Sequence, residues 1–165
     1  MQLLEQLEAH LSDAGCDPRV IAHCRTVNAV AAGYARSSVV DRELLIAGAM
    51  LHDLGRSETH SLHHAEVGAD LARQSGCPDE VARIVQRHIG AGLTVEECAL
   101  LGLIPRDSVP QRLEERIVAH ADNLVKGTRV ITPEERMDRS VTLGRKFLVR
   151  AFRLGLDLEP LRHLR

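Results

Sequence analysis

The segment from Leu45 to Arg56 constrains the fold most, because an apolar helix there runs directly into a histidine and an aspartate. Residues 44–51 are almost wholly apolar, which predicts a helix buried on all sides. His52 and Asp53 follow it, and Gly55 can end the helix in a left-handed conformation. Burying polar groups without partners costs several kcal/mol, so these two side chains need a partner. A metal ion is the natural one.

A lone His-Asp dipeptide more often pairs with itself or caps its helix. Taken alone, His23 likewise resembles an ordinary core histidine, because it shares a helix face with Val20 and Val27. The rest of the chain favours a shared site, since further ligand-type side chains sit at or near the ends of other apolar helical segments. They are His23, His64, His88 and Asp122.

The chain has 165 residues, enough for one domain with a real hydrophobic core. With one tyrosine and two phenylalanines, that core must be built from Leu, Val, Ile and Ala. The formal net charge of −2 implies no strong field toward nucleic acid or membrane. Residues 126–165, however, hold ten Lys/Arg and five Asp/Glu. Such a basic C-terminal segment is typical of proteins that bind an anionic ligand.

Location follows from the cysteines and from the first residues. Cys16, Cys24, Cys77 and Cys98 have neither Cys-x-x-Cys nor zinc-ribbon spacing, which predicts free thiols in a reducing cytoplasm. The N-terminal residues carry acids where a signal peptide carries positive charge, and no apolar run approaches membrane-spanning length. We expect a soluble, cytoplasmic protein.

No stretch alternates as a strand does, and the pattern predicts an all-α bundle of seven to nine helices. Three starts are marked by local chemistry: Asp17-Pro18, Asp41, and the capping box of Thr94 and Glu97. The expected helices are residues 3–14, 18–36, 41–53, 61–75, 79–88, 94–103, 113–126 and a long last helix, 133–154.

Several segments resemble those of one family. Residues 51–56 resemble the HDIG signature of the HD-domain superfamily of metal-dependent phosphohydrolases. Residues 64–69 resemble its His-x-Glu-Ile-Gly-Ala segment, and 117–122 its helix with the final aspartate. The resemblance covers about 18–128. It implies an HD-domain helical bundle as a single domain, 1–165, with a C-terminal helical extension over 129–165.

The ligand types are imidazole and carboxylate, which suit iron, manganese, zinc, cobalt or nickel better than magnesium or calcium. Six protein groups are too many for one catalytic ion that keeps an open position, so two divalent ions sharing Asp53 fit better. By resemblance, one ion takes His23, His52, Asp53 and Asp122, and the other takes Asp53, His64 and His88.

Such a pair activates a water for attack on phosphorus, with Asp53 orienting it. Arg56 stands where family members often carry lysine and is a candidate for holding a substrate phosphate. The alternative for Arg56 is a solvated loop residue. Glu66 is a candidate for orienting a ligand histidine. If Arg56 is not the phosphate clamp, the C-terminal basic face is next: Arg139, Lys146, Arg150 and Arg153.

The four other histidines singled out, His60, His63, His120 and His163, are expected to lie outside the ligand set. We expect a phosphohydrolase acting on a small phosphorylated substrate such as a nucleotide, rather than on nucleic acid or at a membrane. Two alternatives stay open. One is a mixed-valent di-iron oxygenase of the same superfamily, and the other is a non-catalytic metal- or nucleotide-binding module.

Overall fold

The computed structural model describes residues 2–35, 39–140 and 144–162, and most of these are helical. Over these ranges there are nine α-helices and one two-stranded antiparallel hairpin, so the predicted all-α bundle of seven to nine helices is confirmed. The helices are α1 Gln2–Asp13, α2 Pro18–Ala31, α3 Arg42–Leu51, α4 His64–Gln74, α5 Asp79–Arg87, α6 Val95–Leu100, α7 Leu113–Asn123, α8 Pro133–Ser140 and α9 Arg145–Leu158.

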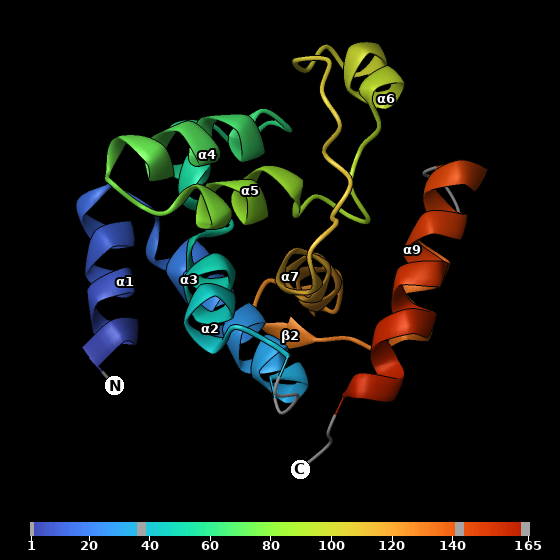
Figure 1. The fold of residues 1–165 in the computed structure, drawn as a ribbon, viewed down its shortest axis with the longest axis horizontal. Helices are drawn as coiled ribbons and strands as arrows, with labels where there is room; N and C mark the ends of the chain where they lie inside the picture. Colours follow the sequence, from blue (N-terminus) through green and yellow to red (C-terminus); the bar gives the residue numbers. More distant parts are fainter. Residues whose placement is uncertain (1, 36–38, 141–143, 163–165) are drawn as a thin grey trace.

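Helix α7 lies in the middle of the molecule and packs on α2, α3, α5 and α9 (Figure 1). The core between them is aliphatic, as the composition predicts, and Leu45, Met50, Leu51 and Ile117 are fully buried in it. Helix α3, which is followed by His52 and Asp53, lies in the core and packs on α1, α2, α5 and α7. In the described part of the chain, no helix has the length and apolar character needed to span a membrane.

The three helix starts predicted from local chemistry are confirmed, whereas the helix expected to open at Ser61 begins at His64. The carboxylate of Asp17 accepts a hydrogen bond from the Arg19 amide, and that of Asp41 accepts one from the Leu44 amide. Thr94 forms the predicted capping box at the start of α6. These local bonds satisfy amide groups that have no partner within the helix.

Helix ends were predicted less well. Helix α7 ends at Asn123 and not at Lys126, since the chain then forms the hairpin β1 Val125–Lys126 and β2 Arg129–Val130. Helix α2 ends at Ala31 and continues as a 3₁₀ turn, η1 Ala32–Tyr34.

The single helix predicted over 133–154 is wrong, because α8 and α9 are separate helices. Gly144, just before α9, has φ +94°, a left-handed conformation that a continuous α-helix does not allow. Val141, expected on the apolar face of that helix, lies outside the described residues.

Candidate metal centre

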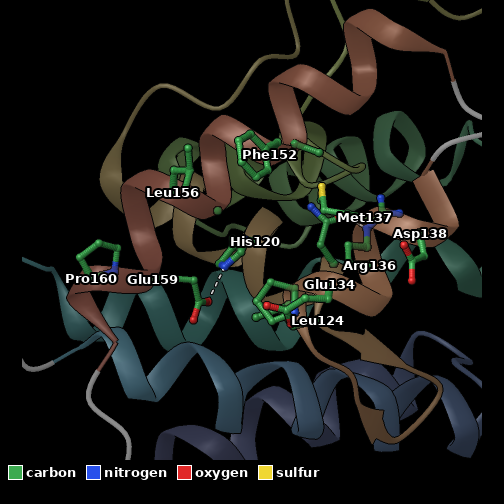
Figure 2. A pocket seen from close by; sticks show the side chains of 14 residues that line it. His120, Leu124, Glu134, Arg136, Met137, Asp138, Phe152, Leu156, Glu159 and Pro160 are labelled. Carbon is green, nitrogen blue, oxygen red and sulfur yellow. Dashed lines mark hydrogen bonds and ion pairs between the residues drawn. The ribbon is translucent and has the colours of Figure 1, made fainter.

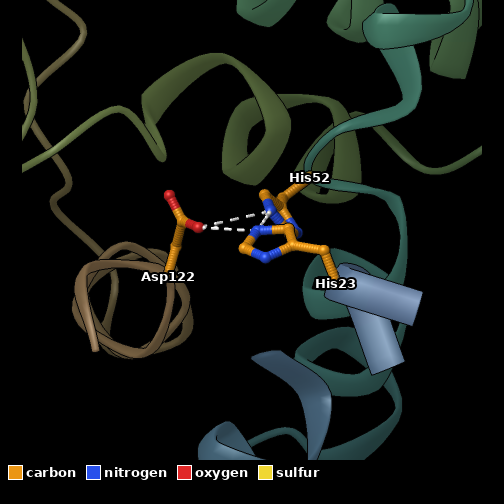
Figure 3. A group of neighbouring side chains, drawn as sticks. All are labelled: His23, His52 and Asp122. Carbon is orange, nitrogen blue, oxygen red and sulfur yellow. Dashed lines mark hydrogen bonds and ion pairs between the residues drawn. The ribbon is translucent and has the colours of Figure 1, made fainter. Parts of the chain in front are cut away.

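The six side chains predicted as ligands lie together. Five of them stand at or next to a helix end, whereas His23 lies within α2. His23 is on α2, His52 and Asp53 follow the last residue of α3, and His64 opens α4. His88 follows α5, and Asp122 lies in the last turn of α7. Figure 3 shows three of them, His23, His52 and Asp122, converging from three helices.

The first half of the cluster surrounds one oxygen of Asp122. The Nε2 of His23 lies 3.0 Å from Oδ1 of Asp122 and 3.3 Å from Nε2 of His52. Oδ2 of Asp53 faces the same two rings, at 3.8 Å from His52 and 3.9 Å from His23.

The second half surrounds the other oxygen of Asp53. The Nε2 atoms of His64 and His88 are 3.1 Å apart, and both face Oδ1 of Asp53, at 3.2 and 3.6 Å. Asp53 therefore presents one carboxylate oxygen to each pair of histidines.

All four rings are held by the same kind of contact, a hydrogen bond from Nδ1 to a backbone carbonyl. The pairs are His23 with Gly127 at 2.7 Å, His52 with Ala49 at 2.8 Å, His64 with Ser61 at 2.7 Å and His88 with Val85 at 2.6 Å. A carbonyl oxygen only accepts, so each Nδ1 carries the hydrogen. Each Nε2 therefore faces the centre. In a ring whose one hydrogen is on Nδ1, Nε2 carries the lone pair that binds a metal.

This arrangement fits a cation. The Nε2 atoms of each histidine pair lie 3.1–3.3 Å apart, and two imidazoles whose single hydrogens are on Nδ1 have no hydrogen to share there. A positive charge beside these nitrogens stabilises such a pair. His23, His52 and Asp122 form one group that could hold a metal ion, and His52, Asp53 and His88 form another.

The charges agree with this interpretation. Burial raises the pKa of Asp53, but the surrounding imidazoles outweigh it and hold the pKa well below its ordinary value. The pKa of Asp122 is lowered in the same way, against its own burial, chiefly by the imidazoles of His23 and His52, whose Nε2 atoms lie 3.0 and 3.6 Å from its Oδ1. Burial lowers the pKa of His88. The carboxylates are thus ionised and His88 is neutral, the forms that bind metals.

His52 differs from His88. Burial alone would lower its pKa, but Cys24, Asp53 and Asp122 raise the pKa well above its ordinary value. This point of the site favours a positive charge, which a bound cation would also provide.

The structure shows which of the two neighbouring histidines, His63 or His64, belongs to the cluster. His64 is buried and faces His88, whereas the side chain of His63 is 50% exposed and lies 3.3 Å from the carboxylate of Glu66. Glu66 also accepts a hydrogen bond from the Ile104 amide. The prediction that Glu66 orients a ligand histidine is wrong, since the carbonyl of Ser61 holds His64 instead.

Arg56 lies at the centre and not in a solvated loop. Its Nε is 2.8 Å from Oδ2 of Asp53, and its side chain is 29% exposed. It follows Asp53 in the 3₁₀ turn η2, Leu54–Ser57, whose geometry brings residues three apart onto one side. The expected left-handed helix end at Gly55 is wrong, because Gly55 is part of this turn.

The predicted C-terminal basic face is dispersed in the structure. Arg150 donates to the carbonyl of Gly92 and to Glu97, which ties α9 to the segment around α6. Lys146 and Arg153 are exposed, and the side chain of Arg139 lies outside the described part.

Among the described residues, none of the other histidines joins the cluster. His120 lies in a separate hollow of about 690 Å³ between α7, α8 and α9, where its Nε2 is 2.8 Å from Glu159 (Figure 2). His60 is exposed, and His163 is outside the described residues.

Two hollows open at the cluster. The His88 hollow, about 490 Å³, is lined by His64, His88, Asn123, Lys126 and Arg136, and the His23 hollow, about 460 Å³, by Arg19, His23, Asp53 and His60. Arg56, Asp122 and Gly127 line both. Sequence reasoning missed Asn123, Lys126 and Arg136. Of these three, only Asn123 could have been suspected from the sequence, because it directly follows Asp122.

The chain resembles curated proteins over parts of their length. It is 45% identical over 129 residues to the tRNA (cytidine(56)-2'-O)-methyltransferase of Picrophilus torridus, a match that covers 78% of this chain and 38% of that protein. It is 47% identical over 119 residues to an uncharacterized protein of Methanocaldococcus jannaschii, covering 69% and 70%. A shorter match to Ribonuclease Y of Cutibacterium acnes, 37% identical over 73 residues, covers 42% of this chain and 14% of that protein.

Among solved structures, the chain resembles the HD domain of the L. monocytogenes phosphodiesterase PgpH in complex with cyclic-di-AMP. The TM-score is 0.53 at 15% identity, with 100% of this chain and 99% of that one covered. At this identity the likeness shows the fold alone. The family model of the HD domain matches residues 20–127, which contain all six clustered side chains. This chain belongs to the HD-domain family, whose members bind divalent metals.

Proposed function

We propose that this chain is a metal-dependent phosphohydrolase that cleaves a phosphate ester or anhydride of a nucleotide-like or other small phosphorylated substrate. The observation that supports this most is the division of Asp53 between two pairs of histidines. One carboxylate between two sets of imidazole nitrogens would suit two cations, which would supply the chemistry of two-metal hydrolases.

In this proposal His23, His52, Asp53 and Asp122 hold one ion, and Asp53, His64 and His88 hold the other. Imidazole and carboxylate together suit iron, manganese, zinc, cobalt or nickel. When bound, such ions neutralise phosphate charge and activate a water for attack on phosphorus. The protein contributes fixed ring orientations, because every Nδ1 is anchored on a carbonyl of the main chain.

Arg56 is the second residue to which we assign a catalytic role, beside Asp53. It lines both hollows and its Nε pairs with Asp53, so its planar guanidinium stands at the edge of the centre where a substrate phosphate enters. An arginine held on one carboxylate and presented to a second anion is a common way to hold phosphate.

The relatives support the same reaction class. The name of Ribonuclease Y describes cleavage of RNA, whose nucleotides are joined by phosphodiester bonds. The name of the methyltransferase describes another reaction, and this chain spans 38% of that protein. Because the four cysteines are free thiols, we also infer a cytoplasmic location.

The test is a measurement of metal content together with a substrate screen. Protein purified without chelator and reconstituted with each transition metal is expected to hold two ions per chain. It is then assayed on mono-, cyclic, di- and dinucleoside polyphosphates and short oligonucleotides, with free phosphate and nucleotide products resolved. A protein that stays metal-free, or a metal-loaded protein that releases no product, contradicts the proposal. Oxygen uptake by a mixed-valent iron form would favour the oxygenase alternative.

A further inference from the structure

The His88 hollow carries more positive charge than one phosphate at the metal centre requires. Besides Arg56, it is lined by Lys126 on β1 and Arg136 on α8. Of the described residues that line it, Asp122 is the one acid, and this residue already belongs to the ligand set. A hollow lined by several cationic side chains attracts anions.

Arg136 is held in place by contacts that reach back to the centre. Its Nε donates to Oδ1 of Asn123 at 2.9 Å, and its guanidinium carbon lies 5.9 Å from the ring centroid of Phe147. Asn123 in turn donates from Nδ2 to the carbonyl of Gly90 at 2.7 Å, two residues after His88. An arginine positioned in this way loses little side-chain freedom when it binds a ligand.

Lys126 points to an anion for a different reason. It is exposed on the hairpin and pairs across the two strands with Arg129, which places like charges opposite each other. Such a pair is unfavourable in a hairpin unless its charge is neutralised. Glu135 neutralises Arg129 at 3.1 Å, and a ligand anion would do the same for Lys126.

The hollow is also large enough for more than one phosphate. Its volume of about 490 Å³ falls in the range of sites for nucleotide-sized ligands. From these observations we infer that Lys126 and Arg136 form a second anion site, so that the substrate carries a second phosphate beside the one that is cleaved. This inference rests on the proposed function, because it assigns the scissile phosphate to the metal centre.

The test compares two probes on manganese-loaded protein by calorimetry: inorganic phosphate and methylenediphosphonate, which is not hydrolysed. The parent is expected to bind the diphosphonate at least tenfold more tightly than phosphate. Arg136→Ala should weaken diphosphonate binding about tenfold or more, the effect of a lost charge-assisted hydrogen bond, and change phosphate binding less than threefold. Arg153→Ala, an exposed arginine on α9, is the matched control and should leave both affinities unchanged.

Lys126→Ala is the second variant, because its exposed side chain is not needed for folding and its result counts even if Arg136→Ala is unstable. It should lower diphosphonate affinity in the same direction. Equal affinity of the parent for both probes, or equal effects of Arg136→Ala and Arg153→Ala, would overturn the inference. If diphosphonate binding depends on these residues but no substrate is hydrolysed, the proposed function fails and the anion site stands. If hydrolysis is found and the two variants bind diphosphonate like the parent, the anion site alone fails.

Discussion

Gly55 and Gly68 bring two backbones into contact beside the metal centre. A Cβ on Gly68 would lie 2.8 Å from the amide nitrogen of Gly55, and a Cβ on Gly55 would lie 2.6 Å from that of Gly68. This contact packs η2, which follows Asp53, directly against α4, which begins with His64. The spacing between two of the proposed ligands therefore depends on the absence of two side chains.

We predict that Gly68→Ala lowers the free energy of unfolding by about 1–3 kcal/mol, since the nearest atom to the new Cβ is the backbone nitrogen of Gly55, which cannot move aside easily. The variant should also bind metal more weakly, because η2 and α4 are forced apart. Gly155→Ala is the matched control. Its Cβ would lie 3.5 Å from a ring carbon of His120, an ordinary contact, and alanine should stabilise α9 by up to about 1 kcal/mol. Urea denaturation and metal analysis of both variants check this, and equal stabilities would contradict it.

The neighbouring pair His63 and His64 gives a direct test of the second ion. We predict that His64→Ala lowers the metal content from two ions to one, because its Nε2 faces Asp53 and His88. His63→Ala should keep both ions, since that ring is half exposed and contacts Glu66. Asp53→Ala should lose both, because Asp53 faces both histidine pairs. Elemental analysis of the three reconstituted variants decides, and loss of metal from His63→Ala would mean that the ligand register is wrong.

Arg56→Ala separates two roles of that arginine. If Arg56 holds the substrate phosphate, kcat/KM should fall roughly ten- to hundredfold, by about 1.5–3 kcal/mol, with metal content unchanged. Arg56→Lys should recover part of this, because the charge stays but the planar fork is lost. If Arg56 instead serves mainly to hold Asp53, metal content falls together with activity. Steady-state kinetics and metal analysis on the same samples distinguish these outcomes, and an unchanged kcat/KM would remove Arg56 from the site.

The buried group of His120, Glu159 and Tyr34 predicts a pH dependence of stability. Burial lowers the pKa of His120, so the folded protein favours the neutral ring more than the unfolded chain does. The unfolded chain then binds more protons below about pH 6.5, and the free energy of unfolding should fall as the pH drops through this value. His120→Gln should show a shallower fall. Urea denaturation between pH 5 and 8 measures the difference between parent and variant. Identical slopes would contradict the prediction.

Sequence alone was sufficient for the fold class and for which six residues gather. Helix starts are local events, made by side chains such as Asp17 and Thr94 within three residues of the amides they bind. The six clustered residues were recognised through the resemblance of three segments to the HD-domain family. Five of them also stand at or next to the end of an apolar helical segment, whereas His23 lies within α2. Such ends are where a polar side chain can leave a buried helix without breaking its hydrogen bonds.

Tertiary structure decided how those residues are used. The orientation of each imidazole depends on a carbonyl partner, and that of His23 is on Gly127, 104 residues away. The position of Arg136 beside the centre depends on contacts to Asn123 and Phe147. The separation of α8 from α9 likewise became visible only in the structure, where Gly144 has a left-handed backbone conformation just before α9. Helical periodicity reports which residues share a face over three or four positions. It carries no information on which distant backbone will meet that face, and those long-range contacts set the geometry and the charge of the site.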